Sequence, residues 1–431
     1  MKNRILSNTI WIITVQCIKA LMTLGVYMLT ARYLGPSNYG LINYAAAIVS
    51  FIAPFMYLGY NNILVQELVH YPDKEGEIMG TAIISSFFSS IICIGLIIIF
   101  VFIINTKEKE TLLVCSLYSS LLLFQSMDLI IYWFQAKLIA KYSSSVSLCA
   151  HIIIMLYKIY ILISGKSIYW FAISSAMEYM VVSLSLLFVY RYLGGSKLKF
   201  SLKRMKKMLN VSKYYIISSV MVSISVYIDR IMIKIMINDI ITGYYSAAVT
   251  CAAMTTFIFV AIIDSFRPVI LEYKIKNKNK YQETIKLLYS LILYLAIIQG
   301  ILTFCLATPI VYIIFGSSYL TTTSLLKVVV WYTPFSYLGA IRNIWILAEE
   351  KGKYLWMINF VSAIVNIVTN LVLIPSFGAL GAAIASLISN FITIVVMSYI
   401  IKPIRENFYL MISSLNPKIL INSANYIINK K

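Results

Sequence analysis

Histidines, acidic residues and catalytic signatures are scarce in this chain of 431 residues. Its two histidines, His70 and His151, are too few for a histidine-based metal cluster. The sequence contains no H-E-x-x-H or G-x-S-x-G motif. The triplet at 165–167 lacks the glycine that opens a phosphate-binding loop, because position 160 is Tyr. We therefore expect a protein that is not an enzyme and carries no metal or cofactor of its own.

Paired cysteines and a cleavable leader are also missing. The six cysteines lie in apolar segments without a C-x-x-C spacing, which is typical of buried thiols. The apolar run from Thr9 to Ala31 is too long for a signal-peptide core and has no small-residue cleavage site after it. It is therefore predicted to be a retained first transmembrane helix.

Apolar residues dominate what remains. The chain is 61% hydrophobic and only 12% charged, with a mean hydropathy of +0.86, which is the composition of an integral membrane protein. Hydropathy predicts an all-α protein with about twelve spans. They run roughly over residues 8–32, 39–60, 80–104, 111–135, 144–164, 168–190, 213–237, 242–265, 285–307, 324–347, 355–375 and 380–401.

The basic residues fix the expected orientation. Of the 36 Lys and Arg residues, 26 fall in the loops on the side of the N-terminus and four in the loops on the other side. This bias predicts that both termini are cytoplasmic. It also explains the net charge of +20, so that no binding of nucleic acid is needed to account for this charge. We expect an N-terminal bundle (1–190), a basic cytoplasmic linker (191–212) that forms an amphipathic helix on the inner leaflet, a C-terminal bundle (213–402) and a cytoplasmic or interfacial tail (403–431).

Charges within the seventh predicted span organise the functional interpretation. Asp229 and Arg230 follow serines at helical spacing, so this helix presents a polar face. Lys19 lies on a similar Ser/Thr/Asn/Gln stripe of the first span. Ionised groups at this depth cost several kcal/mol unless water or a partner solvates them, so the two stripes indicate a wet cavity. The alternative is that Asp229 and Arg230 belong to an internal ion pair that only stabilises the helix bundle.

Further charges fall inside other predicted spans. Lys158 and Glu178 lie on neighbouring helices and are expected to form an ion pair. Asp128, Glu178, Asp229 and Asp264 are candidates for binding a coupling ion. Lys327 and Arg342 are further cations within the predicted spans.

A weak internal repeat relates the two halves. Gly40 opens a segment after the first span that resembles the segment opened by Gly243 after the seventh, half a chain later. An even number of spans separates them, so the copies share one orientation. Parallel repeats of this kind predict two bundles related by a pseudo-two-fold axis along the membrane normal, with substrate between them.

Several short motifs in order carry a resemblance to a known family. They are Arg32-Tyr33-Leu34-Gly35-Pro36 with Tyr39-Gly40, Asp128 with Tyr132-Trp133-Phe134-Gln135 and Lys141-Tyr142, Tyr227-Ile228-Asp229-Arg230 with Gly243-Tyr244-Tyr245-Ser246-Ala247-Ala248, Phe315-Gly316 with Tyr319, and Ile374-Pro375 with Gly378 and Gly381-Ala382-Ala383. Together they resemble the Wzx-type flippases of O-antigen and other polysaccharide repeat units, within the multidrug/oligosaccharidyl-lipid/polysaccharide (MOP) exporter superfamily. The similarity runs over nearly the whole chain.

The resemblance implies a flippase in the bacterial inner membrane that acts in polysaccharide, including lipopolysaccharide, biosynthesis. Its substrate would be an undecaprenyl-diphosphate-linked oligosaccharide, moved by alternating access through a cationic cavity between two six-helix bundles. By helix position, Lys19 and Arg230 would bind the diphosphate. A polysaccharide polymerase and a chain-length regulator are expected partners besides membrane lipid, and Na⁺ or H⁺ is the expected coupling ion. The alternatives are an ion-coupled small-molecule exporter of the MATE type and a membrane polysaccharide polymerase.

Overall fold

The computed structural model describes residues 2–417, and it describes side chains throughout that range except at 2–14, 16, 17, 20 and 21. The chain divides at Gly243 into two compact units, which are treated separately below. All elements in the described range are helical, as expected for an all-α membrane protein.

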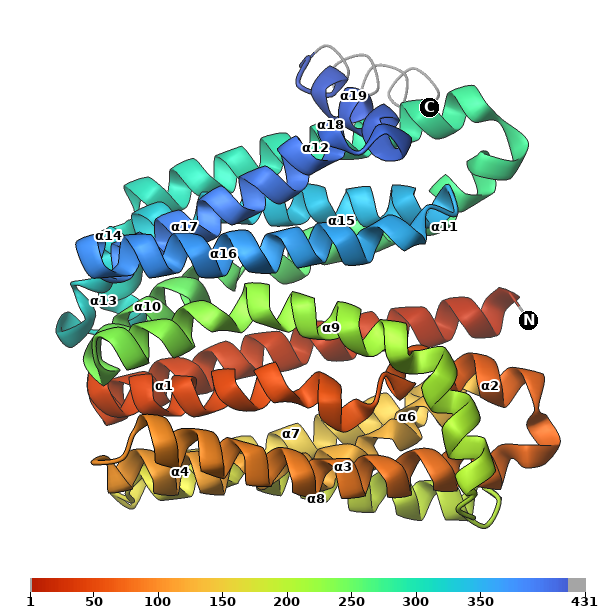
Figure 1. The fold of residues 1–431 in the computed structure, drawn as a ribbon, viewed down its shortest axis with the longest axis horizontal. Coiled ribbons are helices and arrows are strands. Elements are labelled where there is room, and N and C mark those ends of the chain that lie inside the picture. The colour runs from red at the N-terminus through yellow and green to blue at the C-terminus, as the bar shows by residue number, and fades with distance from the viewer. Residues whose placement is uncertain (1, 418–431) are drawn as a thin grey trace. The chain divides into compact units, whose positions relative to one another are not determined.

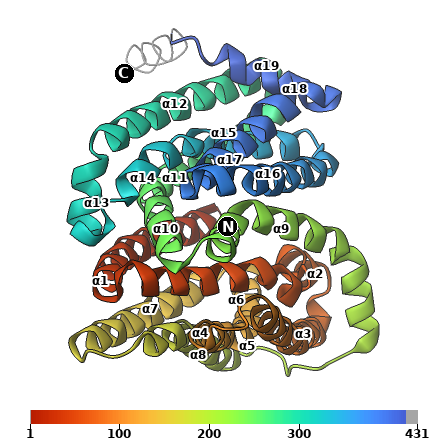
Figure 2. The ribbon, with the colours of Figure 1, turned by 60° about the vertical axis from the view of Figure 1, so that its left-hand side comes forward.

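The first unit is built around a long, broken N-terminal helix (Figure 1). Helix α1 reverses direction at Gly35, whose φ of 68° is a left-handed conformation that suits glycine. Helix α7 packs against both α1 and α8 (Figure 2). The helices are α1 (Lys2–Tyr57), α2 (Leu64–His70), α3 (Glu75–Ile104), α4 (Lys109–Ser119), α5 (Leu121–Gln125), α6 (Ile131–Ala136), α7 (Ala140–Ile163), α8 (Ile168–Tyr192) and α9 (Leu202–Met236), with a 3-10 segment η3 (Ser126–Ile130) between α5 and α6.

Helix α10 (Asp239–Ala253) crosses the boundary between the units. The other helices of the second unit are α11 (Thr256–Lys276), α12 (Lys278–Cys305), α13 (Ala307–Phe315), α14 (Thr322–Val329), α15 (Tyr332–Ala348), α16 (Leu355–Phe377), α17 (Ala379–Phe391), α18 (Met397–Ile400) and α19 (Arg405–Ser413). The 3-10 turn η4 (Ser317–Tyr319) lies between α13 and α14, and a π-helical segment, Ile392–Val396, follows α17.

Each unit has its own aromatic core. In the first, Trp133 packs edge-on against Tyr190, with ring centroids 4.9 Å apart. In the second, Phe259 stacks on Tyr337 at 4.1 Å. The tail helix α19 joins the second core through a hydrogen bond of 3.0 Å from the Tyr289 hydroxyl to Asn407 Oδ1.

Nine helices in the described range are long and apolar enough to cross a membrane, or ten if the bent pair α10 and α11 forms one span. Two local features explain why this number is lower than the twelve spans predicted from the sequence. The first two predicted spans fall in α1, on either side of Gly35, and the predicted span at 324–347 is divided between α14 and α15. The layout of two six-helix bundles stays a prediction.

The sequence predicts a helix of its own for the basic linker, but in the structure no separate helix forms there. Its first part is extended and lies against α3, where the Lys199 amide donates to the Gly76 carbonyl at 2.9 Å. A Cβ at Gly76 would lie 2.3 Å from the backbone oxygen of Lys197, so only glycine permits this approach. The rest forms the N-terminal turns of α9, which Ser201 caps by accepting from the Arg204 amide.

Candidate functional site

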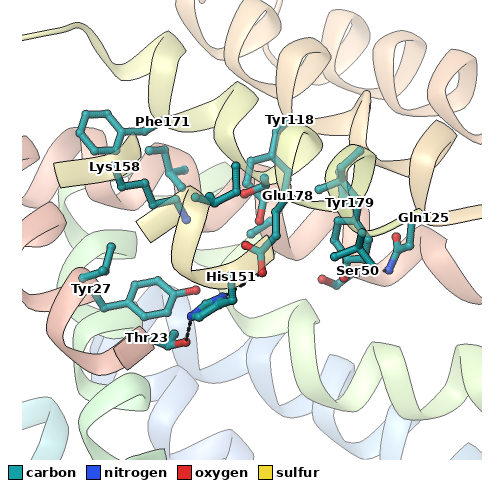
Figure 3. Close-up of a pocket in the computed structure, with 18 of the residues that line it drawn as sticks. Thr23, Tyr27, Ser50, Tyr118, Gln125, His151, Lys158, Phe171, Glu178 and Tyr179 are labelled. Atoms are coloured by element: carbon teal, nitrogen blue, oxygen red, sulfur yellow. Dashed lines mark hydrogen bonds and ion pairs between the residues drawn. The ribbon is translucent and has the colours of Figure 1, made fainter. Parts of the chain in front are cut away.

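A cavity of about 410 Å³ lies inside the first unit, lined by residues of α1, α4, α5, η3, α6, α7 and α8 (Figure 3). Four of the sequence-predicted charges line it: Lys19, Asp128, Lys158 and Glu178. Tyr27, Tyr118 and Tyr179 add hydroxyl groups and aromatic faces. The cavity therefore offers charges of both signs together with polar aromatic side chains.

Two parallel hydrogen bonds join α1 to α7 across this cavity. The Lys19 ammonium donates to Ser147 Oγ at 2.8 Å. One turn further along both helices, the Thr23 hydroxyl lies 3.0 Å from His151 Nε2. Both pairs are separated by the same 128 residues, so the i, i+4 spacing of the two helices is in register.

Helix α8 extends the second of these contacts into a chain of three side chains. His151 Nδ1 lies 2.9 Å from Glu178 Oε1, as the dashed lines of Figure 3 show. An ionised carboxylate accepts only, so the Nδ1 proton faces Glu178. His151 Nε2 can then accept from the Thr23 hydroxyl when the ring is neutral, or donate to it when the ring is protonated.

Lys158 and Glu178 are close enough to interact electrostatically, but they do not form the direct ion pair that we expect from the sequence. Among the described residues, the ion-pair partner of Glu178 is His151, and Lys158 lines the same cavity beyond ion-pair distance of any carboxylate. Asp128 keeps Oδ1 buried without a hydrogen-bond partner in the described part of the chain. Lys158 and Asp128 are therefore available to a ligand that enters the cavity.

Helix α9 places the central charge pair differently. Asp229 is buried, with 4% of its surface exposed. Arg230 is not among the cavity-lining residues, although it is close enough to Tyr27 for an electrostatic interaction. Its Nε is buried without a hydrogen-bond partner among the described residues. Asp229 and Arg230 thus lie on the helix next to the cavity rather than in its wall.

The candidates in the second unit have local partners. Asp264 forms an exposed pair with Arg267, one turn along α11, at 3.0 Å. Lys327 lies over the Phe304 ring at 5.4 Å. Arg342 is buried and donates from Nη1 to the Thr393 carbonyl at 2.7 Å, within the π-helical segment.

A sequence model of a family described as polysaccharide biosynthesis protein matches residues 5–274, more than half of the chain. The chain belongs to this family.

Curated relatives and solved structures agree with this assignment. The probable low-salt glycan biosynthesis flippase Agl15 of Haloferax volcanii is 26% identical over 46% of this chain and 43% of its own length, so the match spans less than half of that relative. The capsular polysaccharide biosynthesis protein CapF of Staphylococcus aureus is 21% identical over 90% of this chain and 96% of its own length.

Two solved transporters share the fold. The lipid II flippase MurJ in an inward closed conformation superposes with a TM-score of 0.70 at 16% identity, over 94% of this chain and 91% of its own. An inward-facing multidrug resistance MATE family transporter of the MOP superfamily gives 0.67 at 13% identity, over 92% and 95%. These likenesses show that this member of the polysaccharide biosynthesis family has the same fold as these two transporters.

Sequence reasoning missed two residues of this family member. His151 was set aside because two histidines cannot build a metal cluster, yet its place four residues after Ser147 puts it on the cavity face of α7. Lys234 falls within the predicted span at 213–237, where nothing in the sequence indicates a role for it, and it is the most deeply buried lysine of the ion pairs in the described range. No group of three or more potential metal ligands occurs in residues 2–417.

Proposed function

We propose that the chain is a flippase that moves undecaprenyl-diphosphate-linked oligosaccharide repeat units from the cytoplasmic to the outer leaflet of the bacterial inner membrane. Membership of the polysaccharide biosynthesis family carries this proposal. The cavity inside the first unit supports it, because its two lysines provide compensating charge at membrane depth. In this proposal the protein is a transporter and catalyses no covalent step.

Lys19 and Arg230 are the proposed ligands of the diphosphate. Lys19 lines the cavity and is held by a neutral serine hydroxyl, so an anion can replace Ser147 as the acceptor. Arg230 lies on α9, close enough to the cavity residue Tyr27 for an electrostatic interaction. Its Nε has no hydrogen-bond partner among the described residues, which leaves donor capacity for a phosphate oxygen. A lysine and an arginine on different helices would contact the diphosphate from two directions.

The cavity carboxylates are the proposed site of the coupling ion. Glu178 Oε1 lies 2.9 Å from His151 Nδ1, and an imidazole can take up and release a proton, which favours H⁺ over Na⁺ at this position. Asp128 and Asp229 are further candidates. Asp264 fits this role less well, because it is exposed and paired with Arg267.

The rest of the expected setting belongs to the same proposal. Two six-helix bundles, at 1–190 and 213–402, alternate between inward-open and outward-open states, with both termini in the cytoplasm. A polysaccharide polymerase and a chain-length regulator would receive the translocated repeat unit, which in an O-antigen system ends in lipopolysaccharide.

A MATE-type exporter of small molecules is the second candidate function. The fold favours it as well, and the cavity balances two lysines with two carboxylates instead of being purely cationic. A cationic small molecule would then bind Asp128 and Glu178. The two candidates differ in whether a lipid-linked glycan or a soluble cation crosses the bilayer.

Reconstitution tests both candidates directly. Purified protein in proteoliposomes should flip a fluorescent lipid-diphosphate oligosaccharide, monitored by quenching from outside, faster than protein-free liposomes do. A cationic drug added in excess should leave that rate unchanged. No acceleration of the glycolipid, together with drug uptake driven by an ion gradient, would replace the flippase by the exporter.

A further inference from the structure

A buried lysine joins three segments of the first unit at one end of its helices. Lys234 Nζ lies 2.7 Å from Glu108 Oε2 and 2.6 Å from Asp239 Oδ2, and 2% of its side chain is exposed. Glu108 precedes α4, Lys234 lies near the end of α9, and Asp239 begins α10. By the charge asymmetry of the loops, this end faces the outer side of the membrane.

A hydrogen-bond network extends this cluster to α1. Glu108 Oε2 also accepts from Thr111 Oγ1 at 2.6 Å and from Asn105 Nδ2 at 3.4 Å. Asn105 Oδ1 in turn accepts from the hydroxyl of Tyr44, a fully buried residue of α1, at 3.1 Å. Figure 1 shows the end of α9, the turn of α1 and the start of α4 at the same end of this unit.

Backbone contact closes the same end. A Cβ at Gly40 would lie 1.9 Å from the Asp239 carbonyl oxygen, and a Cβ at Gly243 would lie 2.0 Å from the Pro36 carbonyl oxygen. These two glycines are the paired positions of the internal repeat. The turn of α1 and the first residues of α10 therefore touch backbone to backbone, an approach that no larger residue allows.

We propose that Lys234, with Glu108 and Asp239, is the latch of an outer gate that the Gly40–Gly243 contact seals. The inference rests on the proposed alternating-access transport. Opening the gate separates α10 and α9 from the α3–α4 loop, and this separation requires Lys234 to give up Glu108.

The surroundings of Glu108 and Asp239 allow the contact between Lys234 and Glu108 to break. Nearly half of the Glu108 side chain is exposed, so water can solvate this carboxylate when Lys234 leaves. Asp239 follows Lys234 by five residues and can remain its partner through the motion. The second Asp239 oxygen, Oδ1, is buried without a hydrogen-bond partner in the described residues, so the closed arrangement leaves one polar atom unsatisfied. Buried charge clusters of this kind favour one of two packings without making it irreversible.

Outside labelling of a cavity cysteine tests the latch without any substrate. Ala46→Cys places a thiol in the cavity wall beyond Gly40, in a protein whose native cysteines are replaced. In right-side-out vesicles, Lys234→Met combined with Glu108→Gln and Asp239→Asn removes the charges but leaves no buried charge unpaired. We expect this triple variant to react about tenfold faster with an impermeant maleimide, which corresponds to a shift of about 1.4 kcal/mol in the equilibrium between the closed and open states.

Lys109→Met is the matched control, since Lys109 lies beside Glu108 but is exposed. It should label at the parental rate. An unchanged labelling rate in a folded triple variant would overturn the latch and make the cluster purely structural. The labelling reports on the gate even if the glycolipid is not flipped, so failure of the latch and failure of the proposed function are distinguishable.

Discussion

Lys19→Met is the sharpest test of the proposed diphosphate site. The change keeps the length of the side chain and removes its charge, and the lost Ser147 contact is a single hydrogen bond of 2.8 Å. A hydrogen bond to a charged group contributes about 1.5–3 kcal/mol. In the proposed site Lys19 makes one such bond to the diphosphate, and its loss is the cause of the expected effect. Because 1.36 kcal/mol is a factor of ten, flipping of the diphosphate lipid should slow by about 10- to 150-fold.

The assay is flipping in proteoliposomes at matched amounts of folded protein. Ser147→Ala keeps the charge and removes only the resting partner, so it should retain most of the rate. Lys327→Met, in the second unit and stacked on Phe304, controls for loss of an intramembrane lysine. A normal rate in Lys19→Met, or a loss of protein stability in its place, would refute the reasoning.

Three further predictions follow from single contacts. Glu178→Gln keeps an acceptor for its histidine partner but removes the charge, so flipping driven by a proton gradient should be lost while the melting temperature in detergent stays within a few degrees. Gly243→Ala should lower that melting temperature because its Cβ meets a backbone oxygen at 2.0 Å, whereas Gly95→Ala, with nothing within 4 Å, should not. Burial alone would raise the pKa of Glu349, but hydrogen bonds, chiefly from Lys274, hold this pKa below its ordinary value of 4.5. The contribution of Glu349 to the free energy of unfolding should therefore be present above pH 4.5 and be lost as the pH falls through the lowered pKa. The pH profile of stability of Glu349→Gln should lack this change.

Composition was enough to predict a helical membrane protein, because hydrophobic length is a local property of the sequence. The positions of breaks were harder to predict. The pair Gly35 and Pro36 predicts a turn. Whether the chain on its two sides forms one continuous helix or two separate spans depends on the backbone geometry at Gly35. The predicted span at 324–347 contains the break between α14 and α15, where the residues from Val330 to Trp331 are as apolar as a helix interior.

The candidate site was predictable as a set of charges but not as a set of contacts. Lys19, Asp128, Lys158 and Glu178 stand out because charge is rare in apolar helices, and all four line one cavity. Their pairing depends on how α7 and α8 are rotated about their own axes, which hydropathy does not encode. That rotation brings His151 rather than Lys158 to Glu178.

The balance of charge in the cavity bears on how a flippase can release its cargo. A site with cations alone would hold a diphosphate strongly in the low dielectric of the membrane, and transport requires binding that is weak enough to reverse. Asp128 and Glu178 oppose Lys19 and Lys158 within the same walls. Protonation of a carboxylate would strengthen the hold on the anion, and loss of that proton would weaken it. Within the proposed alternating-access cycle, the two signs of charge would thus couple a cation gradient to binding and release.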